Sequence, residues 1–280
     1  MKSVLEVCGL EKTYPAFSLK EISFDLEPGR ITGFIGRNGA GKTTTLKCLL
    51  GLLHRDSGEI RYWGRPFSGN ENWVKQRLGF ISGGIGFYPA KKLRTITRVT
   101  RRFYENWDEN AYEDCIRRFE LDEEKSPNQL SQGMKVKYAL TLALSHGATL
   151  LILDEPTSGL DPVSRDALLE LFLDLRDRGV TILFSTHITA DLQRCADNLI
   201  YIQQGRILAR DSLAAFVAGY RRICLPQCPA DPAQSGLLGL RRERDGVSAL
   251  IAATDAVRFP EARETDLENI MVYLEREAQR

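Results

Sequence analysis

The sequence predicts an α/β fold built around a mostly parallel central sheet. The first observation is a glycine-rich stretch, GRNGAGKTT at residues 36–44, set between an apolar run at 31–35 and a helical pattern at 44–53. The second is a pair of further apolar runs, at 149–156 and 180–185. Short continuous apolar runs bounded by polar segments are typical of strands buried on both faces, as the strands of parallel sheets are.

The glycine-rich stretch matches the phosphate-binding loop pattern and has the strand before it and the helix after it that this loop requires. Glycines allow backbone dihedrals closed to other residues, so that successive N–H groups can face phosphate oxygens. Lys42 supplies a positive charge for the β- and γ-phosphates, and Thr43 supplies a hydroxyl for Mg²⁺. An ordinary glycine-rich turn is the alternative, and the context argues against it. We therefore predict a nucleotide-binding P-loop NTPase core.

Composition narrows the class of protein further. The chain has 280 residues, enough for one or two domains, with 38 Lys+Arg against 37 Asp+Glu and a net charge of +1. This balance gives no sign of a nucleic-acid partner. No stretch approaches the ~18 apolar residues of a membrane span, and the N-terminus lacks the apolar core of a signal peptide. The six scattered cysteines, Cys224 and Cys228 included, are expected to be free thiols.

Before the loop, residues 3–10 and 19–26 are predicted strands, and the second alternates as a sheet with one buried face does. A further strand at 59–63 completes an antiparallel β subdomain. Tyr14 falls in the connection between the first two strands. It either stacks on a nucleotide base or packs as a partly buried aromatic, and this stretch favours neither.

From residue 95 to about 145 the pattern is helical, which predicts a helical subdomain, at about 84–145, inserted after a strand that ends at 79–82. The basic run at 98–104 is interpreted as a solvated helix face, because the net charge is balanced and no nucleic-acid motif accompanies it. Two apolar faces are expected, Val99–Phe103–Trp107 on one helix and Tyr112–Cys115–Ile116–Phe119 on the next.

Two carboxylates end the apolar run at 149–156, where ligands of open α/β sheets bind. Asp154 can hold Mg²⁺ directly or through water, and Glu155 is placed to take a proton from an attacking water. Asp161, followed by Pro162, is a predicted helix N-cap. His187 ends the neighbouring strand, which favours a contact to the γ-phosphate.

The last part of the chain is predicted to be a small α+β appendage at 212–280, after a hairpin at 199–209 that closes a domain at 1–211. Its expected elements are a helix, three short strands and a terminal helix, at 213–220, 222–225, 237–242, 247–252 and 266–278.

With these motifs in view, residues 3–212 resemble the ATP-binding subunit of ABC transporters. The most specific motif is LSQGM at 130–134, which is similar to the family signature LSGGQ. A phosphate loop followed in order by LSQGM, LDEP, SGLD and TH is hard to obtain otherwise. The FELD, DPVSR and DLENIMVYL segments look most like subunits of bacterial exporters whose permease is a separate chain.

The resemblance implies contacts to ATP from an adenine-stacking aromatic and from the phosphate loop, namely Tyr14, Asn38, Gly39, Ala40, Gly41, Lys42, Thr43 and Thr44. It implies Mg²⁺ ligands at Thr43 and Asp154, and catalytic roles for Lys42, for Glu155 as general base and for His187 as switch histidine. Ser131, Gly133 and Asp161 match segments that act across the interface with a second subunit.

The family then implies a head-to-tail dimer, of identical or different subunits, around two Mg·ATP. The expected function is an ATPase subunit that drives a membrane permease, that of an exporter, from the cytoplasmic, inner face of the membrane. The rivals are a soluble ABC-type regulator acting on ribosomes or DNA, and a nucleotide-dependent scaffold that hydrolyses weakly.

Two positions depart from the family pattern. Met134 replaces the glutamine of the signature, which should have little effect because the serine and glycine make the γ-phosphate contacts. Gly83 stands where the family places glutamine, or glutamate in such exporters, and glycine has no side chain to sense Mg²⁺ or water. The expected consequence is slow hydrolysis with ATP binding intact.

Overall fold

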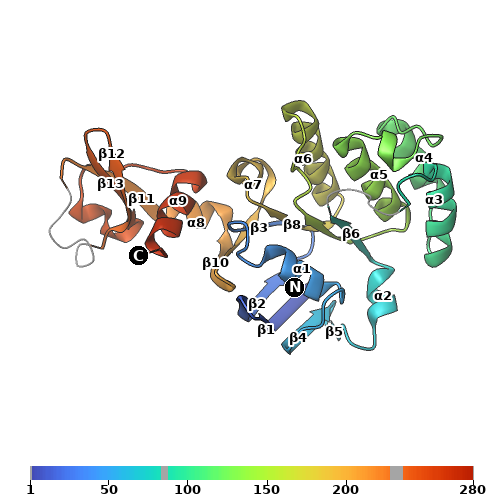
Figure 1. The fold of residues 1–280 in the computed structure, drawn as a ribbon, viewed down its shortest axis with the longest axis horizontal. Coiled ribbons are helices and arrows are strands. Elements are labelled where there is room, and N and C mark those ends of the chain that lie inside the picture. Colours follow the sequence, from blue (N-terminus) through green and yellow to red (C-terminus); the bar gives the residue numbers. More distant parts are fainter. Residues whose placement is uncertain (1, 83–87, 228–235, 280) are drawn as a thin grey trace. The chain divides into compact units, whose positions relative to one another are not determined.

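A computed structural model describes residues 2–82, 88–227 and 236–279 (Figure 1). The chain divides into two compact units. The first comprises Met1–His187 and Arg194–Arg210, and the second Ile188–Gln193 and Asp211–Arg280. Gly83 and Cys228 lie outside the described residues, so the predictions made for them stay predictions.

The central sheet of the first unit has the strand order β10-β9-β3-β8-β7-β6. Neighbouring strands from β9 to β6 run parallel, which confirms the predicted α/β class. Every residue of β3, β7 and β8 is buried, which explains why these segments are rich in apolar residues and do not alternate between polar and apolar. The bounds are β3 Ile31–Ile35, β6 Leu78–Ser82, β7 Leu150–Asp154, β8 Thr181–Thr186, β9 Asn198–Gln203 and β10 Arg206–Ser212.

Helices follow the strands of this sheet. The helix after the phosphate loop, α1 (Lys42–Leu49), begins earlier than the sequence pattern predicted, because the N-cap is Gly41 itself. It also ends earlier, at Leu49. Helix α6 (Pro162–Asp177) begins as predicted, with the Asp161 carboxylate accepting the backbone N–H groups of Val163 and Ser164. One side of α6 is buried, namely Leu168, Leu171, Phe172 and Leu175. Helix α7 (Thr189–Cys195) follows β8.

A second, antiparallel sheet has the order β2-β1-β4-β5 and shares a hydrophobic core with the central sheet. Its strands are β1 Leu5–Tyr14, β2 Phe17–Leu26, β4 Ser57–Tyr62 and β5 Arg65–Pro66. Tyr14 was expected in the connection between the first two strands. Instead it is the last residue of β1 and pairs with Phe17. The strands extend this far because a two-residue turn suffices to join them.

The helical subdomain comprises α3 (Leu93–Thr100), α4 (Glu109–Arg118) and α5 (Gln132–Ser145), with α2 (Glu71–Lys75) before β6 (Figure 1). The predicted face through Val99 and Phe103 is wrong, since these side chains are 40% and 71% exposed. Helix α3 ends at Thr100 and passes into a 3₁₀ turn, so the helical spacing does not continue to Phe103. The buried side of α3 is Leu93, Ile96 and Thr97.

The second unit contains a three-stranded antiparallel sheet, β11-β13-β12, covered on one side by α9. All the elements expected for the α+β appendage occur: α8 Leu213–Ala218, β11 Tyr220–Leu225, β12 Leu238–Glu243, β13 Gly246–Ala252 and α9 Leu267–Glu277. Tyr273 of α9 is fully buried, and its hydroxyl donates to Ser248 Oγ at 2.7 Å. This buried hydrogen bond helps to fix the helix on the sheet.

Candidate nucleotide-binding site

The phosphate loop, residues 36–44, is shaped by glycines that other residues could not replace. A Cβ at Gly36 would lie 2.2 Å from the Ile202 carbonyl oxygen, so β9 packs directly against the loop backbone. Gly39 and Gly41 have φ values of +83° and +114°, in the left-handed region. The loop is therefore built for close backbone approach, which is what a phosphate cradle needs.

Lys42 lies inside this loop and is only 5% exposed. Its Nζ donates to the Gly36 carbonyl at 2.6 Å and to the Arg37 carbonyl at 3.4 Å. It also lies 3.5 Å from Glu155 Oε1. A desolvated ammonium held by loop carbonyls is a strong partner for an anion that enters the loop.

Asp154, at the carboxyl end of β7, meets the start of α1. Thr43 Oγ1 donates to Asp154 Oδ1 at 3.2 Å, and the carboxylate is buried. Hydroxyl and carboxylate oxygens are hard ligands of the kind that Mg²⁺ prefers. The two residues predicted as metal ligands are thus brought together from positions far apart in the sequence, and their chemistry fits Mg²⁺.

Glu155 occupies a constrained corner directly after β7, with a φ of +49° that is unusual for a non-glycine residue. Its Oε2 lies 2.9 Å from His187 Nδ1, and its Oε1 faces the Lys42 ammonium. Glutamate, histidine and lysine therefore converge at the carboxyl edge of the parallel sheet, the edge where ligands of such folds bind.

Ser185 is a member of this group that sequence reasoning missed. It lies in β8 opposite Asp154, is fully buried, and its Oγ donates to Asp154 Oδ1 at 2.6 Å. The one available signal was its position near the end of an apolar strand, two residues before His187.

Ser131, Gly133 and Asp161 lie at helix starts rather than at the phosphate loop. Ser131 is the N-cap of α5 and accepts the Met134 N–H at 3.2 Å. Gly133 lies in the first turn of the same helix. A Cβ added at Gly133 would lie 3.6 Å from the Leu160 side chain, which is an ordinary van der Waals contact. Hydrogen bonds from Ser164 hold the pKa of Asp161 below its usual range, as befits a charged cap. The signature segment therefore adjoins the loop that leads into α6.

The remaining residues predicted to bind nucleotide differ in how far they are exposed. Asn38 and Gly39 are exposed, whereas Ala40 is buried and its carbonyl accepts the Gly205 N–H at 3.0 Å. Thr44 is half-buried in α1, and the Tyr14 ring is 37% exposed at the end of β1.

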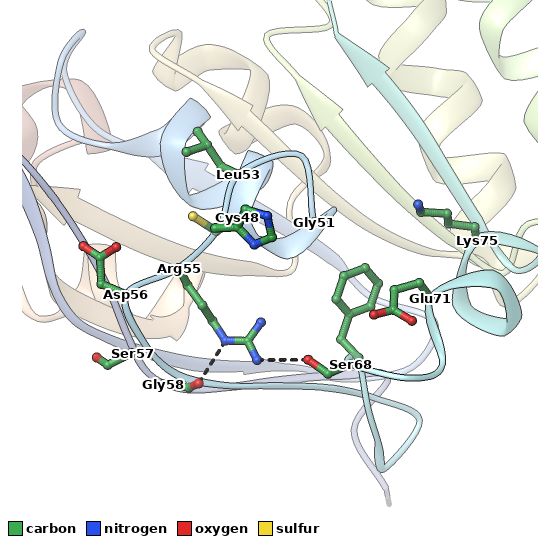
Figure 2. A pocket seen from close by; sticks show the side chains of 12 residues that line it. Cys48, Gly51, Leu53, Arg55, Asp56, Ser57, Gly58, Ser68, Glu71 and Lys75 are labelled. Carbon is green, nitrogen blue, oxygen red and sulfur yellow. Dashed lines mark hydrogen bonds between the residues drawn. The ribbon is translucent and has the colours of Figure 1, made fainter.

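A separate cavity of about 490 Å³ lies between the end of α1, β4 and α2 (Figure 2). Arg55 crosses it, with Nε donating to the Gly58 carbonyl at 3.0 Å and Nη2 to Ser68 Oγ at 3.4 Å (Figure 2). Glu71 and Lys75 also line it. None of the residues predicted to bind nucleotide lines this cavity, so it is not the predicted site.

The chain is a P-loop NTPase. This class is defined by the loop that glycines shape, by the buried lysine inside it and by the two acidic residues at the edge of the sheet. Comparison with known proteins gives the family: residues 19–158 match the model described as ABC transporter. The bacitracin transport ATP-binding protein BcrA of Bacillus licheniformis is 34% identical over 212 residues, which cover 74% of this chain and 69% of that protein. The Nod factor export ATP-binding protein I of Burkholderia lata is 35% identical over 202 residues, covering 70% and 66%.

A solved structure of the ATP-binding subunit of an ABC transporter is 31% identical, with a TM-score of 0.69, and the match covers 76% of this chain and 91% of that one. The chain belongs to the ABC transporter family of ATP-binding proteins and has its ATPase fold, which confirms the resemblance. It spans about two thirds of the length of the curated relatives it matches. Within the described residues, no helix is both long and apolar enough to cross a bilayer.

Proposed function

We propose that the chain binds ATP with Mg²⁺, hydrolyses it as one half of a head-to-tail dimer, and thereby drives a separate membrane permease. The observation that carries the proposal is the convergence of Lys42, Asp154, Glu155 and His187 at one edge of the sheet. This convergence favours hydrolysis over the alternative of a weakly hydrolysing scaffold, because it places a carboxylate between a lysine and a histidine.

The residues divide the chemistry between them. Lys42 and the loop amides would bind the phosphates, while Thr43 and Asp154 would hold Mg²⁺, which supplies charge neutralisation when it is bound. Glu155 would accept the proton of the attacking water. With its proton on Nδ1, His187 would donate to Glu155 Oε2 and so orient the carboxylate. Such positioning and charge stabilisation account for most of phosphoryl-transfer catalysis.

The dimer is supported by where the signature lies. Ser131 is exposed, and its described hydrogen bond goes to its own helix rather than to the phosphate loop. Since the resemblance assigns the signature to the interface between subunits, we infer that Ser131 acts on ATP held by a partner. The partner is either a second copy or a different ATP-binding subunit.

Transport is supported by the relatives, whose names state bacitracin transport and Nod factor export. We therefore propose an exporter, with this chain on the cytoplasmic face of the membrane through its permease and with no nucleic-acid partner. The test is co-purification from detergent-solubilised membranes together with Mg²⁺-dependent ATPase measurement. Lys42→Ala should lose ATP binding and activity. Ribosomal proteins in place of a permease, or ATP binding unchanged in Lys42→Ala, would refute the proposal.

A further inference from the structure

We propose that Ser185 is a positioning residue for Asp154 and Glu155, setting how Mg²⁺ binds with ATP. This inference rests on the proposed function, because it concerns the same site. Nothing in the phosphate-loop or signature motifs points to Ser185, which is fully buried in β8.

The Ser185 hydroxyl lies between the two acidic residues. It donates its proton to Asp154 Oδ1 at 2.6 Å and accepts the Glu155 backbone N–H at 3.0 Å. The parallel register of β7 and β8 sets Ser185 opposite Asp154. A single side chain thus fixes both the rotamer of the proposed metal ligand, Asp154, and the backbone of the proposed base, Glu155.

The Asp154 side of this arrangement decides which oxygen is available to a cation. Thr43 Oγ1 and Ser185 Oγ both approach Oδ1. Among the described residues no hydrogen bond to Oδ2 is found, so Oδ2 would be available to a cation. Without the shorter of the two bonds, the carboxylate would be held by Thr43 alone, and Thr43 is itself a presumed ligand of the same ion. Partners that orient a ligating carboxylate strongly affect metal binding and activity.

The second contact of Ser185 holds the backbone of Glu155, the residue with the positive φ. The Glu155 N–H is shared between Ser185 Oγ and the Ser185 carbonyl oxygen, at 3.0 and 3.1 Å. A left-handed non-glycine residue persists only where its surroundings hold it. Removing the hydroxyl leaves the bond to the carbonyl, so the corner should remain folded while its position becomes less fixed.

The experiment compares Ser185→Ala with Ser185→Thr, which keeps a hydroxyl, in the full chain. The matched control is Ser145→Ala, which removes another fully buried hydroxyl, one that donates to the Thr141 carbonyl at 2.6 Å in α5. Calorimetry gives the ATP affinity with and without Mg²⁺, steady-state assays give kcat and the half-saturating Mg²⁺ concentration, and thermal melting reports folding.

Ser185→Ala should lower the Mg²⁺ enhancement of ATP affinity or kcat by about 10–100-fold, the range found for such outer partners of metal ligands. Its ATP affinity without Mg²⁺ should be unchanged. Ser185→Thr should recover most of the loss, and Ser145→Ala should match the wild type. A Ser185→Ala variant with wild-type Mg²⁺ dependence and kcat would overturn the proposal. If the wild type bound Mg·ATP but failed to hydrolyse it, the proposed function would fail, and the Mg²⁺ dependence of ATP affinity would still decide the role of Ser185.

Discussion

Glu155→Gln tests the central assignment, because glutamine keeps the size of the side chain and an acceptor oxygen but cannot take a proton. In the structure the carboxylate lies 2.9 Å from His187 Nδ1 and 3.5 Å from Lys42 Nζ, and its side chain is only 24% exposed. The substitution therefore removes charge and basicity and leaves no cavity. Its effect on folding should be small.

The expected changes in kcat and in ATP affinity follow from two effects, the loss of the base and the loss of the charge. A positioned general base contributes about 10²–10⁴-fold to the rate, or roughly 2.7–5.4 kcal/mol of barrier, so kcat should fall by that factor. The gross attraction between Glu155 and Lys42 at 3.5 Å is about 5 kcal/mol for an effective dielectric constant of roughly 20. That attraction competes with phosphate for the same ammonium, and the carboxylate also repels phosphate. ATP affinity should therefore be equal or higher in the variant.

The assay measures single-turnover hydrolysis, ATP affinity by calorimetry and dimer formation by gel filtration with Mg·ATP. The ATP-bound dimer should accumulate. Glu243→Gln, which alters a carboxylate 3.0 Å from Arg222 in the appendage, is the control and should hydrolyse ATP normally. Hydrolysis by Glu155→Gln at the wild-type rate would remove this residue from the role of base. A loss of ATP binding would contradict the charge argument.

Three further predictions address the dimer, Gly83 and the helical subdomain. Ser131→Arg should preserve the ATP affinity of the monomer and abolish dimer-dependent hydrolysis; a monomer unable to bind ATP would place Ser131 on its own nucleotide. Gly83→Gln should raise a slow basal ATPase rate, whereas a brisk wild-type rate unaffected by the change would show that no side chain is needed there. Burial lowers the pKa of His146, so the unfolded chain takes up the proton first, and stability should fall as pH drops below about 6.5, by at most about 1.4 kcal/mol per pH unit. In urea titrations at pH 7.5 and 5.5, His146→Phe should weaken this pH dependence while keeping a ring against Tyr104; an unchanged slope would exclude His146 as its source.

The parts of the fold that the sequence predicts well are those set by local pattern. Strands β3, β7 and β8 are buried on both faces, so their apolar runs mark them to within a residue or two. The Asp161-Pro162 pair marks the start of α6 because cap chemistry is local. The meeting of Thr43 with Asp154 also follows from the pattern, since both lie at the carboxyl edge of one parallel sheet.

The parts that the sequence did not predict depend on contacts between distant segments. Val99 and Phe103 keep helical spacing in the sequence, but the helix ends between them, and no strong stop signal announces this. Ser185 looks like any small residue in a buried strand until the register with β7 sets it against Asp154. Buried polar partnerships of this kind are fixed by strand order, which residue patterns do not encode.

Gln76 shows how such a distant contact joins the helical subdomain to β6, at the amino end of the strand and therefore opposite the edge that carries the site. Its amide donates to the Phe103 carbonyl at 2.7 Å and accepts the Glu105 N–H at 3.0 Å. The backbone carbonyl oxygen of Gln76 lies 3.3 Å from Nδ1 of His146, at the end of α5. The His146 ring stacks on the Tyr104 ring, with 3.8 Å between the ring centroids.

Strand β6 begins two residues after Gln76 and ends at Ser82, which pairs with Asp154. A displacement of the segment that carries Phe103 and Glu105 would therefore either break the amide bonds of Gln76 or move the start of β6 along with it. Close-packed interiors transmit such displacements rather than absorb them. Movement of this segment together with β6 would reach Asp154 through its strand neighbour Ser82, so the Gln76 contacts would link the helical subdomain to the proposed metal ligand.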